Sequence, residues 1–400
     1  MSGFLAGIVP FLIIISVIVT IHELGHYLVA RAFGTRIDRF SVGFGSILLR
    51  RVDRHGTEWC VSALPLGGYV KFAGDDNISS MSPSTDELEA ARAAITEREG
   101  AAAVGGYFHF KPLWQRFLII LAGPAANFVL AIFVFTMVNL AFGQMFIPPT
   151  VGEVLPGSGA QAAGFQVGDT ITRVDGHAVD SFEDVHNLII LRADSTIPIV
   201  VARGAQSLTL TTSVGHGPVA GPTGNPVGTG GLLGVRFVDR ELTRRFNPWT
   251  ALVEGNKETW GVLDSTFTYV GRIFAGKENG DKVSGIVGMT KATGDITVAV
   301  AQAKVSVADK MSDLFQFYVQ FIALVSVSIG FLNLLPIPAL DGGHLAFYIW
   351  QSVTKKQVSA GFQAVSFRIA VVLILGLMIF AFWNDINQLG VIKLVKGVLS

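Results

Sequence analysis

Four long stretches without a charged residue divide the chain, at residues 4–21, 117–143, 314–340 and 369–383. A helix needs about 20 mostly apolar residues to cross the hydrocarbon core of a bilayer, and the first three stretches reach or approach that length. The fourth is shorter, but its uncharged character continues through Asn384. The pattern therefore predicts a polytopic α-helical membrane protein with about four transmembrane helices, at about 4–30, 116–140, 314–336 and 367–386.

The segment between the second and third stretches has a different pattern. Within residues 144–240, short apolar runs alternate with Gly, Pro and Asp, which predicts β-strands at 151–155, 170–174, 197–201 and 208–210. A helix is expected after Ser181, because Ser181 and Asp184 form a capping-box pattern ahead of an apolar run. The strings at 157–164, 168–171 and 174–176 resemble a PDZ domain, which binds extended peptides at a sheet edge. A small β-rich domain without a peptide ligand is the alternative.

We accordingly expect a membrane domain in two halves with an insertion. The division is 1–143 for the first half, 144–240 for the β-rich PDZ-like domain, 241–313 for a linker and 314–400 for the second half. Within the linker, residues 242–277 mix tryptophan and aliphatic residues with polar ones in an irregular amphipathic pattern. Such a segment can lie on the membrane surface or pack against the spans.

Composition agrees with a membrane protein and excludes several other classes. Half of the residues are hydrophobic, 15% are charged and the mean hydropathy is +0.52, whereas soluble domains carry about 25% charged residues. A formal net charge of zero gives no indication of nucleic-acid binding. The single cysteine, Cys60, excludes an intramolecular disulfide and a cysteine-rich zinc site. The first stretch lacks the preceding basic residues and the cleavage site of a signal peptide.

Basic residues predict the orientation of the spans. They gather after the first span, before the second, and between the third and fourth: Arg31, Arg36, Arg39, Arg50, Arg51, Arg54, Lys71, Lys111, Arg116, Lys355, Lys356 and Arg368. The positive-inside rule places these regions in the cytoplasm. Both termini and residues 144–313 then face the other side of the membrane. Lys393 and Lys396 run against this pattern, but an even number of spans puts both termini on one side.

The first uncharged stretch ends in a metal-binding pattern, since residues 22–26 read H-E-x-x-H. Residues four apart on a helix share a face, so His22 and His26 can bind one divalent metal ion, and Glu23 on the neighbouring flank can take a proton from metal-bound water. Two satisfied helical histidines with a stray carboxylate are the alternative. Polar groups at the end of an apolar helix are unfavourable in lipid and usually mark function, which favours the metal site.

A zinc ion bound by two histidines needs a further protein ligand. Asp341 is the first carboxylate after the uncharged run 314–340, and it follows two prolines and precedes two glycines. These residues predict that Asp341 sits on unwound backbone, where a carboxylate is suited to face a cation. His344 is an alternative third ligand, but we expect it to lie next to the ligands without binding the metal itself.

Taken together, these motifs resemble the site-2 protease family of intramembrane zinc metalloproteases. The resemblance rests on HELGH at 22–26 and on N-x-x-P-x-P-x-L-D-G at 333–342. The strings LPLGGYVKF at 64–72 and GPAANF at 123–128, with a PDZ-like domain between spans two and three, narrow it to the branch of the regulator of sigma-E protease (RseP). Two departures concern substrate gating: residues 144–313 have room for one PDZ copy where larger relatives carry two, and 284–288 read SGIVG where the family has SGPIG.

The resemblance implies a function. It implies Zn²⁺ on His22, His26 and Asp341, with Glu23 as general base. It further implies hydrolysis of single-span membrane proteins within or near their transmembrane segments, by regulated intramembrane proteolysis. Substrates of this kind include an anti-sigma factor already cut by an upstream site-1 protease, or signal-peptide remnants.

Substrate contacts are expected next to the metal. Residues 58–61 and 68–72 look like a short hairpin within a membrane-associated segment at about 45–73, and its edge can hold a substrate in extended form. Gly67 and Gly68 permit close backbone approach or simply form a turn. Asn333 can bond the substrate backbone or an oxyanion, whereas Asn127 either contacts substrate or bridges helices.

Two functions of other classes compete with a protease. A catalytically silent PDZ membrane scaffold would capture protein tails, but it would have no need for Glu23. A metal transporter would use carboxylates distributed along several spans, and the uncharged stretches of spans two and four, 117–143 and 369–383, have none.

Overall fold

The computed structural model describes residues 2–74, 85–190, 192–220, 226–238, 240, 242–274 and 285–388. Lys393, Lys396, Ser284 and residues 275–277 lie outside this part. The described chain forms two compact units: residues up to Val138 together with those from Pro248, and Asn139–Asn247. The predicted boundaries 144 and 240 fall inside the second unit.

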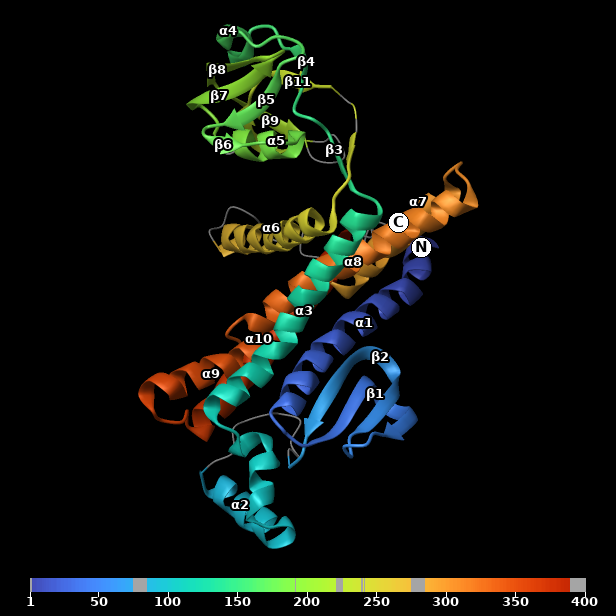
Figure 1. Ribbon diagram of the computed structural model, residues 1–400, viewed down its shortest axis with the longest axis vertical. Coiled ribbons are helices and arrows are strands. Elements are labelled where there is room, and N and C mark those ends of the chain that lie inside the picture. The colour runs from blue at the N-terminus through green and yellow to red at the C-terminus, as the bar shows by residue number, and fades with distance from the viewer. Residues whose placement is uncertain are drawn as a thin grey trace, which may run out of the picture. The chain divides into compact units, whose positions relative to one another are not determined.

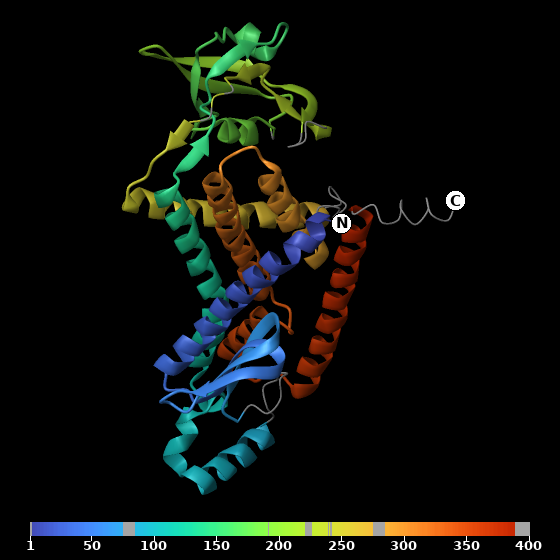
Figure 2. The ribbon, with the colours of Figure 1, turned by 90° about the vertical axis from the view of Figure 1, so that its right-hand side faces the viewer.

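The first unit is built on long apolar helices (Figures 1 and 2). Four of its described helices are long and apolar enough to cross a membrane, α1 (Ser2–Ala32), α3 (Leu113–Ala141), α8 (Val307–Leu334) and α10 (Ala360–Gln388). The prediction of four transmembrane helices is thereby confirmed. Only 11–33% of each span's most apolar window is buried within the protein, so much of this apolar surface is available for contact with lipid.

Small residues allow α7 and the residue before it to pack closely on α1 and α10. Gly3 and Gly7 on α1 lie against α7 (Ile286–Gln302), where a Cβ on Gly7 would stand 1.9 Å from the carbonyl oxygen of Thr290. The start of α7 is bonded to α10, since Gly285 N–H donates to the buried carboxylate of Asp385 at 3.1 Å. Close backbone contact between small residues is the usual way in which helices associate in lipid.

The amphipathic linker is largely helical in its described part. α6 (Pro248–Phe274) packs on α8, where the rings of Phe267 and Phe331 lie 4.6 Å apart. Trp249 and Trp260 on the same helix are exposed. One side of α6 thus packs on the spans, and the other leaves tryptophans free for an interface.

A curled sheet of β1 (Ile37–Val52) and β2 (Glu58–Phe72) follows α1 and lies beside it (Figure 2). β1 reverses at Gly43 and Gly45, whose φ values of 88° and 86° suit glycine. Residues 37–42 of β1 therefore lie between the two halves of β2, pairing with 68–72 on one side and 58–61 on the other, while 47–52 pair with 58–62.

A hairpin lies within the predicted segment 45–73, where residues 47–52 pair with 58–62, but the predicted pairing of 58–61 with 68–72 is wrong. Residues 58–61 and 68–72 both belong to β2 and both pair with β1 instead of with each other. The tight turn lies at 53–57, where the Asp53 carboxylate accepts from the backbone N–H groups of His55 and Thr57. Residues 68–72 form one edge of the sheet.

The exposed side chains of the sheet change along its length from apolar ones to mostly basic ones. Its apolar end exposes large side chains, namely Phe44, Ile47, Leu48, Leu49, Val61, Leu64 and Leu66. The charged residues Arg50, Arg51 and Arg54 lie toward the 53–57 turn. An exposed apolar patch of this kind marks a surface that contacts lipid or protein.

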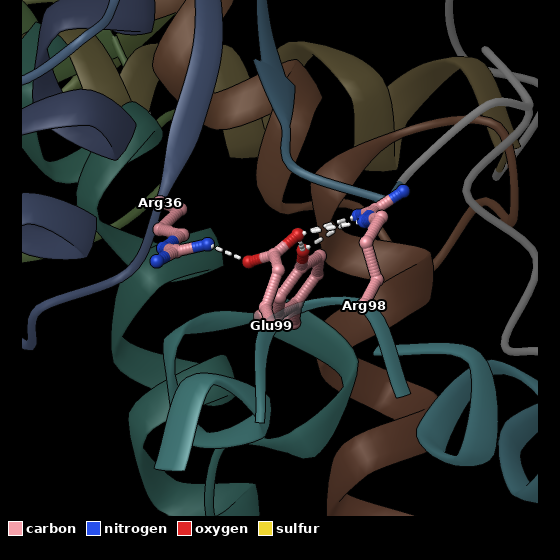
Figure 3. Close-up of polar contacts among 4 residues, drawn as sticks. Arg36, Arg98 and Glu99 are labelled. Atoms are coloured by element: carbon pink, nitrogen blue, oxygen red, sulfur yellow. Dashed lines mark hydrogen bonds and ion pairs between the residues drawn. The ribbon is translucent and has the colours of Figure 1, made fainter. Parts of the chain in front are cut away.

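Helix α2 (Thr85–Glu99) and the short 3₁₀ helices η1 (Ala101–Gly106) and η2 (Phe108–Phe110) lead to α3. Glu99 lies between Arg36 and Arg98 and forms ion pairs with both, as Figure 3 shows. The Tyr107 hydroxyl and the Arg98 guanidinium lower the pKa of Glu99 to about 2, so this carboxylate is ionised. The cluster joins the end of α2 to the residues that precede β1.

The second unit is a small β-rich domain with its own core. An antiparallel sheet has the order β6 (His177–Ala178), β5 (Thr170–Val174), β7 (Thr196–Arg203), β8 (Gln206–Ser213). Further pairs join β4 (Val151–Val154) to β11 (Val235–Phe237), β9 (Gly215–Ala220) to β10 (Pro226–Leu232), and β3 (Gln144–Phe146) to β12 (Leu242–Arg244). Helices α4 (Gly159–Ala163) and α5 (Phe182–Ile190) complete it.

Local predictions for this unit agree with the structure. All four predicted strands are present, and α5 begins as its capping box predicts: Asp184 N–H donates to Ser181 Oγ, and Ser181 N–H donates back to the Asp184 carboxylate, both at 3.1 Å. Asp169 is fully buried, and Arg203 bonds it at 2.7 Å and lowers its pKa. The pair secures the loop before β5, since a buried carboxylate requires such a partner.

Candidate metal centre

Two histidine side chains meet on one face of α1, one helical turn apart. The Nε2 atoms of His22 and His26 are 3.2 Å apart, and their rings cross at 83°. Each residue is only 7% exposed, although both lie on a span whose outer surface is apolar. The spacing of four residues brings the two nitrogens together, as the sequence predicts.

Asp341 reaches the same point from the other half of the membrane domain. Its Oδ2 lies 3.0 Å from His22 Nε2 and 3.5 Å from His26 Nε2. The prediction of unwound backbone at Asp341 needs correction: residues 335–340 are non-helical, but Asp341 is the first residue of α9 (Asp341–Thr354). A carboxylate at that position is favoured by the helix dipole.

The glycines after Asp341 do not form a turn. Gly342 and Gly343 lie within the first turn of α9, where a Cβ would stand 2.2 Å from the Leu335 oxygen and 2.4 Å from the Ile337 oxygen respectively. They are needed because α9 folds tightly back on the unwound segment. That packing fixes where Asp341 begins its helix.

These three side chains fit a zinc ion. They offer two imidazole nitrogens and one carboxylate oxygen, with the candidate ligand atoms all within 4.8 Å of one another. Ligand atoms about 2.0–2.1 Å from a tetrahedral zinc ion are separated by about 3.3–3.4 Å, close to the 3.0–3.5 Å found here. Three protein ligands leave the fourth position open, as in catalytic zinc sites.

Glu23 stands beside this cluster without belonging to it. The side chain is half-buried, and the Val70 backbone N–H is hydrogen-bonded to its carboxylate. Gly68 lies on the same strand, where a Cβ would be 3.4 Å from Glu23 Cγ. The edge strand 68–72 and the metal cluster thus border the same carboxylate.

The two candidate glycines have different surroundings. Gly68 faces Glu23 and α1, so a side chain there would approach the carboxylate. Gly67 instead lies under the ring of Phe44, where a Cβ would be 2.1 Å from Cε2. Of these two glycines, only Gly68 therefore lies against Glu23.

Two further candidates, Asn333 and His344, are both half-buried. Asn333 is half-buried next to the last residue of α8. His344 is half-buried on α9 and lies outside the group of metal-binding atoms found among the described residues.

Asn127 lies behind the cluster and has no exposed surface. Its amide nitrogen is 3.3 Å from His22 Nδ1, and its backbone oxygen accepts from Ser326 Oγ at 2.9 Å. This position favours a role in joining helices over contact with a substrate.

Sequence reasoning missed one residue at the site, Gly123 on α3. A Cβ on Gly123 would be 2.3 Å from His26 Nε2 and 2.8 Å from His22 Nε2. On the facing side, a Cβ on Gly25 of α1 would be 2.3 Å from the Ala122 oxygen. The spacing from Gly123 to Asn127, one helical turn, was the available signal.

Comparison with known proteins agrees with this geometry. Peptidase family M50 matches residues 10–377. The chain is similar to metalloprotease MmpA of Caulobacter vibrioides, with 43% identity over 402 residues and full coverage of both chains. It is also similar to Atu1380 of Agrobacterium fabrum, whose name describes a zinc metalloprotease, with 38% identity over 97% of this chain and 98% of the relative.

Among solved structures, the PDZ domain of the SdrC-like protein Lmo2051 from Listeria monocytogenes matches 25% of this chain and 92% of its own, at 19% identity and a TM-score of 0.16. The family match includes both halves of the metal cluster, and it begins within α1 and ends within α10. It confirms the resemblance drawn from the motifs, with zinc as the cofactor. The chain belongs to peptidase family M50 and is a multi-pass membrane zinc metalloprotease.

Proposed function

We propose that this protease hydrolyses peptide bonds in or near the transmembrane segments of single-span membrane proteins. The observation that carries the proposal is the position of the metal cluster: its two histidines lie on a membrane-spanning helix, beside the edge of a sheet whose exposed end is apolar. A substrate that reaches this site must itself lie in or next to the bilayer.

The residues take distinct roles in the proposed reaction. His22, His26 and Asp341 would hold the zinc ion, which when bound would supply Lewis-acid chemistry for acidifying water and polarising a peptide carbonyl. The Glu23 carboxylate takes the proton from the attacking water and delivers it to the departing amine. Asn333, at the end of α8, donates from its amide to the substrate backbone or to the oxygen on which charge develops.

A transmembrane helix must be unwound before its peptide bonds can be attacked. Strand 68–72 supports this step because it is an edge of the β1–β2 sheet and borders Glu23. Main-chain groups freed from the substrate helix can pair with this edge, as in other complexes formed by strand addition. Gly68 keeps the space between the edge and Glu23 open.

We place the enzyme in a bacterial inner membrane, with the β-rich PDZ-like unit and both termini on the extracytoplasmic side. The support is the group of basic residues between spans one and two and between spans three and four. Substrates then include an anti-sigma factor trimmed by a site-1 protease, or signal-peptide remnants. The test is incubation of the purified, membrane-reconstituted protein with such substrates, with and without a zinc chelator. Zinc-independent cleavage, or no cleavage of any single-span substrate, would contradict the proposal.

Gly123→Ala is predicted to remove most of the bound zinc, because its new methyl group would occupy the space of the two imidazoles. The matched control is Gly376→Ala on α10, where nothing lies within 4 Å of the added Cβ. Alanine is more favourable than glycine within a helix, so the control substitution should be neutral or slightly stabilising. Zinc analysis of both purified variants checks this. Equal zinc contents would show that Gly123 does not shape the site.

Deleting about 151–238 of the β-rich unit is predicted to spare cleavage of a short, already trimmed substrate. We propose that the unit selects substrates, either by excluding bulky outer domains or by recognising the new terminus left by a first protease. The ends of the deletion are adjacent, since Val238 N–H donates to the Thr150 oxygen at 2.9 Å, and a short linker can join them.

The deletion variant distinguishes the two versions of this role. Under exclusion, it should also cut an untrimmed substrate that the intact protein leaves uncut. Under terminus recognition, it should still leave that substrate uncut. Loss of cleavage of the trimmed substrate in a well-folded, zinc-loaded variant would instead make the unit part of the catalytic machinery.

A further inference from the structure

The hydrogen bonds made by the Nδ1 atoms of His22 and His26 determine whether their Nε2 atoms can bind a metal. A neutral imidazole carries its hydrogen on one ring nitrogen only, and the metal binds the other. Both Nε2 atoms face the cluster, so both Nδ1 atoms must carry the hydrogen and find an acceptor. For His26 the acceptor is the Ile119 carbonyl oxygen on α3, at 2.8 Å.

The corresponding neighbour of His22 is the side-chain amide of Asn127. The amide nitrogen lies 3.3 Å from His22 Nδ1, and this orientation of the amide would bring two N–H donors together. The amide oxygen of Asn127 is buried and has no hydrogen-bond partner in the described part of the chain. In this orientation, the Asn127 amide places its N–H group against the N–H of His22 and leaves its own oxygen without a hydrogen bond. A buried acceptor without a partner is unfavourable.

Rotating the Asn127 amide by 180° removes the contact between the two N–H groups and gives the amide oxygen a hydrogen-bond donor. The oxygen and nitrogen of an asparagine amide have nearly the same size, so hydrogen bonding decides which stands where. After rotation, Oδ1 accepts from His22 Nδ1–H, and the orphaned acceptor gains its partner. Both zinc-binding histidines would then donate to oxygens of α3, from Ile119 and from Asn127.

We propose that Asn127 is a positioning residue that holds His22 Nε2 toward the metal by accepting a hydrogen bond from Nδ1–H. The inference rests on the proposed ligand set. Ser326 Oγ donates to the backbone oxygen of Asn127 and leaves its side-chain amide to His22, and Gly330 of α8 faces Asn127, where a Cβ on the glycine would be 3.2 Å from Asn127 Cβ. Asn127 therefore connects the metal ligands of α1 to both α3 and α8.

The role can be tested through zinc affinity, measured by chelator competition on the purified full-length protein. Asn127→Leu keeps the approximate volume but removes the acceptor, and it should weaken zinc binding about 10–100-fold, as loss of such a partner does elsewhere. Asn127→Asp keeps an acceptor and should retain affinity within about tenfold of the unaltered protein. Substitution of Co²⁺ for zinc gives a second readout, because its visible spectrum reports the ligand geometry.

Two further variants separate this inference from its alternatives. Ser326→Ala removes the α8 bond to the Asn127 backbone and should leave zinc affinity unchanged. His22→Asn should abolish tight binding, and if it does not, the proposed ligand set is wrong. The positioning role is overturned if Asn127→Leu binds zinc normally, if Asn127→Asp is as weak as the Leu variant, or if Ser326→Ala is equally weak. Should the Leu variant fail to fold, a loss of zinc affinity well beyond about tenfold in Asn127→Asp, or any clear loss in Ser326→Ala, would still overturn the role.

Discussion

Replacing Glu23 by Gln is expected to lower the rate of peptide cleavage about 10²–10⁴-fold, the usual contribution of a general base. Gln has the same shape and can still accept the hydrogen bond from the Val70 backbone, but it cannot take up a proton. Glu23 is not one of the three clustered ligands, so zinc content should stay near one ion per chain. The measurement is cleavage of a trimmed single-span substrate, with zinc analysis of the same preparation.

An isosteric control is available in the β-rich unit. Glu153→Gln changes an exposed carboxylate that pairs with Arg236 at the surface, and cleavage should stay within about twofold of normal. If the Glu23 variant cleaves at a comparable rate, Glu23 is not the base.

Asp341→Asn is expected to lower zinc affinity more than about 100-fold, and activity with it, since removing a ligand costs more than removing a ligand's partner. A neutral amide is a poor zinc ligand. His344→Asn, three residues further along α9, should have a much smaller effect because His344 lies outside the cluster. Zinc titration of both purified variants decides between them, and a larger loss in the His344 variant would reverse the assignment.

The metal cluster could be predicted because each half carries a local signal. His22 and His26 share a helix face by spacing alone, and Asp341 is conspicuous after 27 uncharged residues. The four spans follow in the same way from length and hydropathy, because lipid tolerates little else. The helix cap at Ser181 could also be predicted, because its two partners, Ser181 and Asp184, are only three positions apart in the sequence.

Features that depend on contact between distant segments could not be read from one sequence. Asn127 is conspicuous as a polar residue in a span, but its approach to His22 depends on how α1 and α3 cross. The strand pairing failed for a related reason. Gly43 and Gly45 allow β1 to reverse and insert between the halves of β2, and the apolar pattern around them gives no sign of that reversal.

The lengthwise division of the β1–β2 sheet bears on how a substrate helix is opened. Gly68 shares a rung of the sheet with Val42, Val61 and Leu49, and Arg50 already belongs to the next rung, about 3.3 Å away. The edge beside Glu23 therefore lies where apolar side chains give way to charged ones, at the level suited to lipid headgroups and water. Exposed backbone is far less unfavourable there than in the hydrocarbon core, where each unsatisfied group costs several kcal/mol. For the single-span substrates proposed above, we therefore expect that the helix has only to fray from its end and that the ease of fraying selects what is cut.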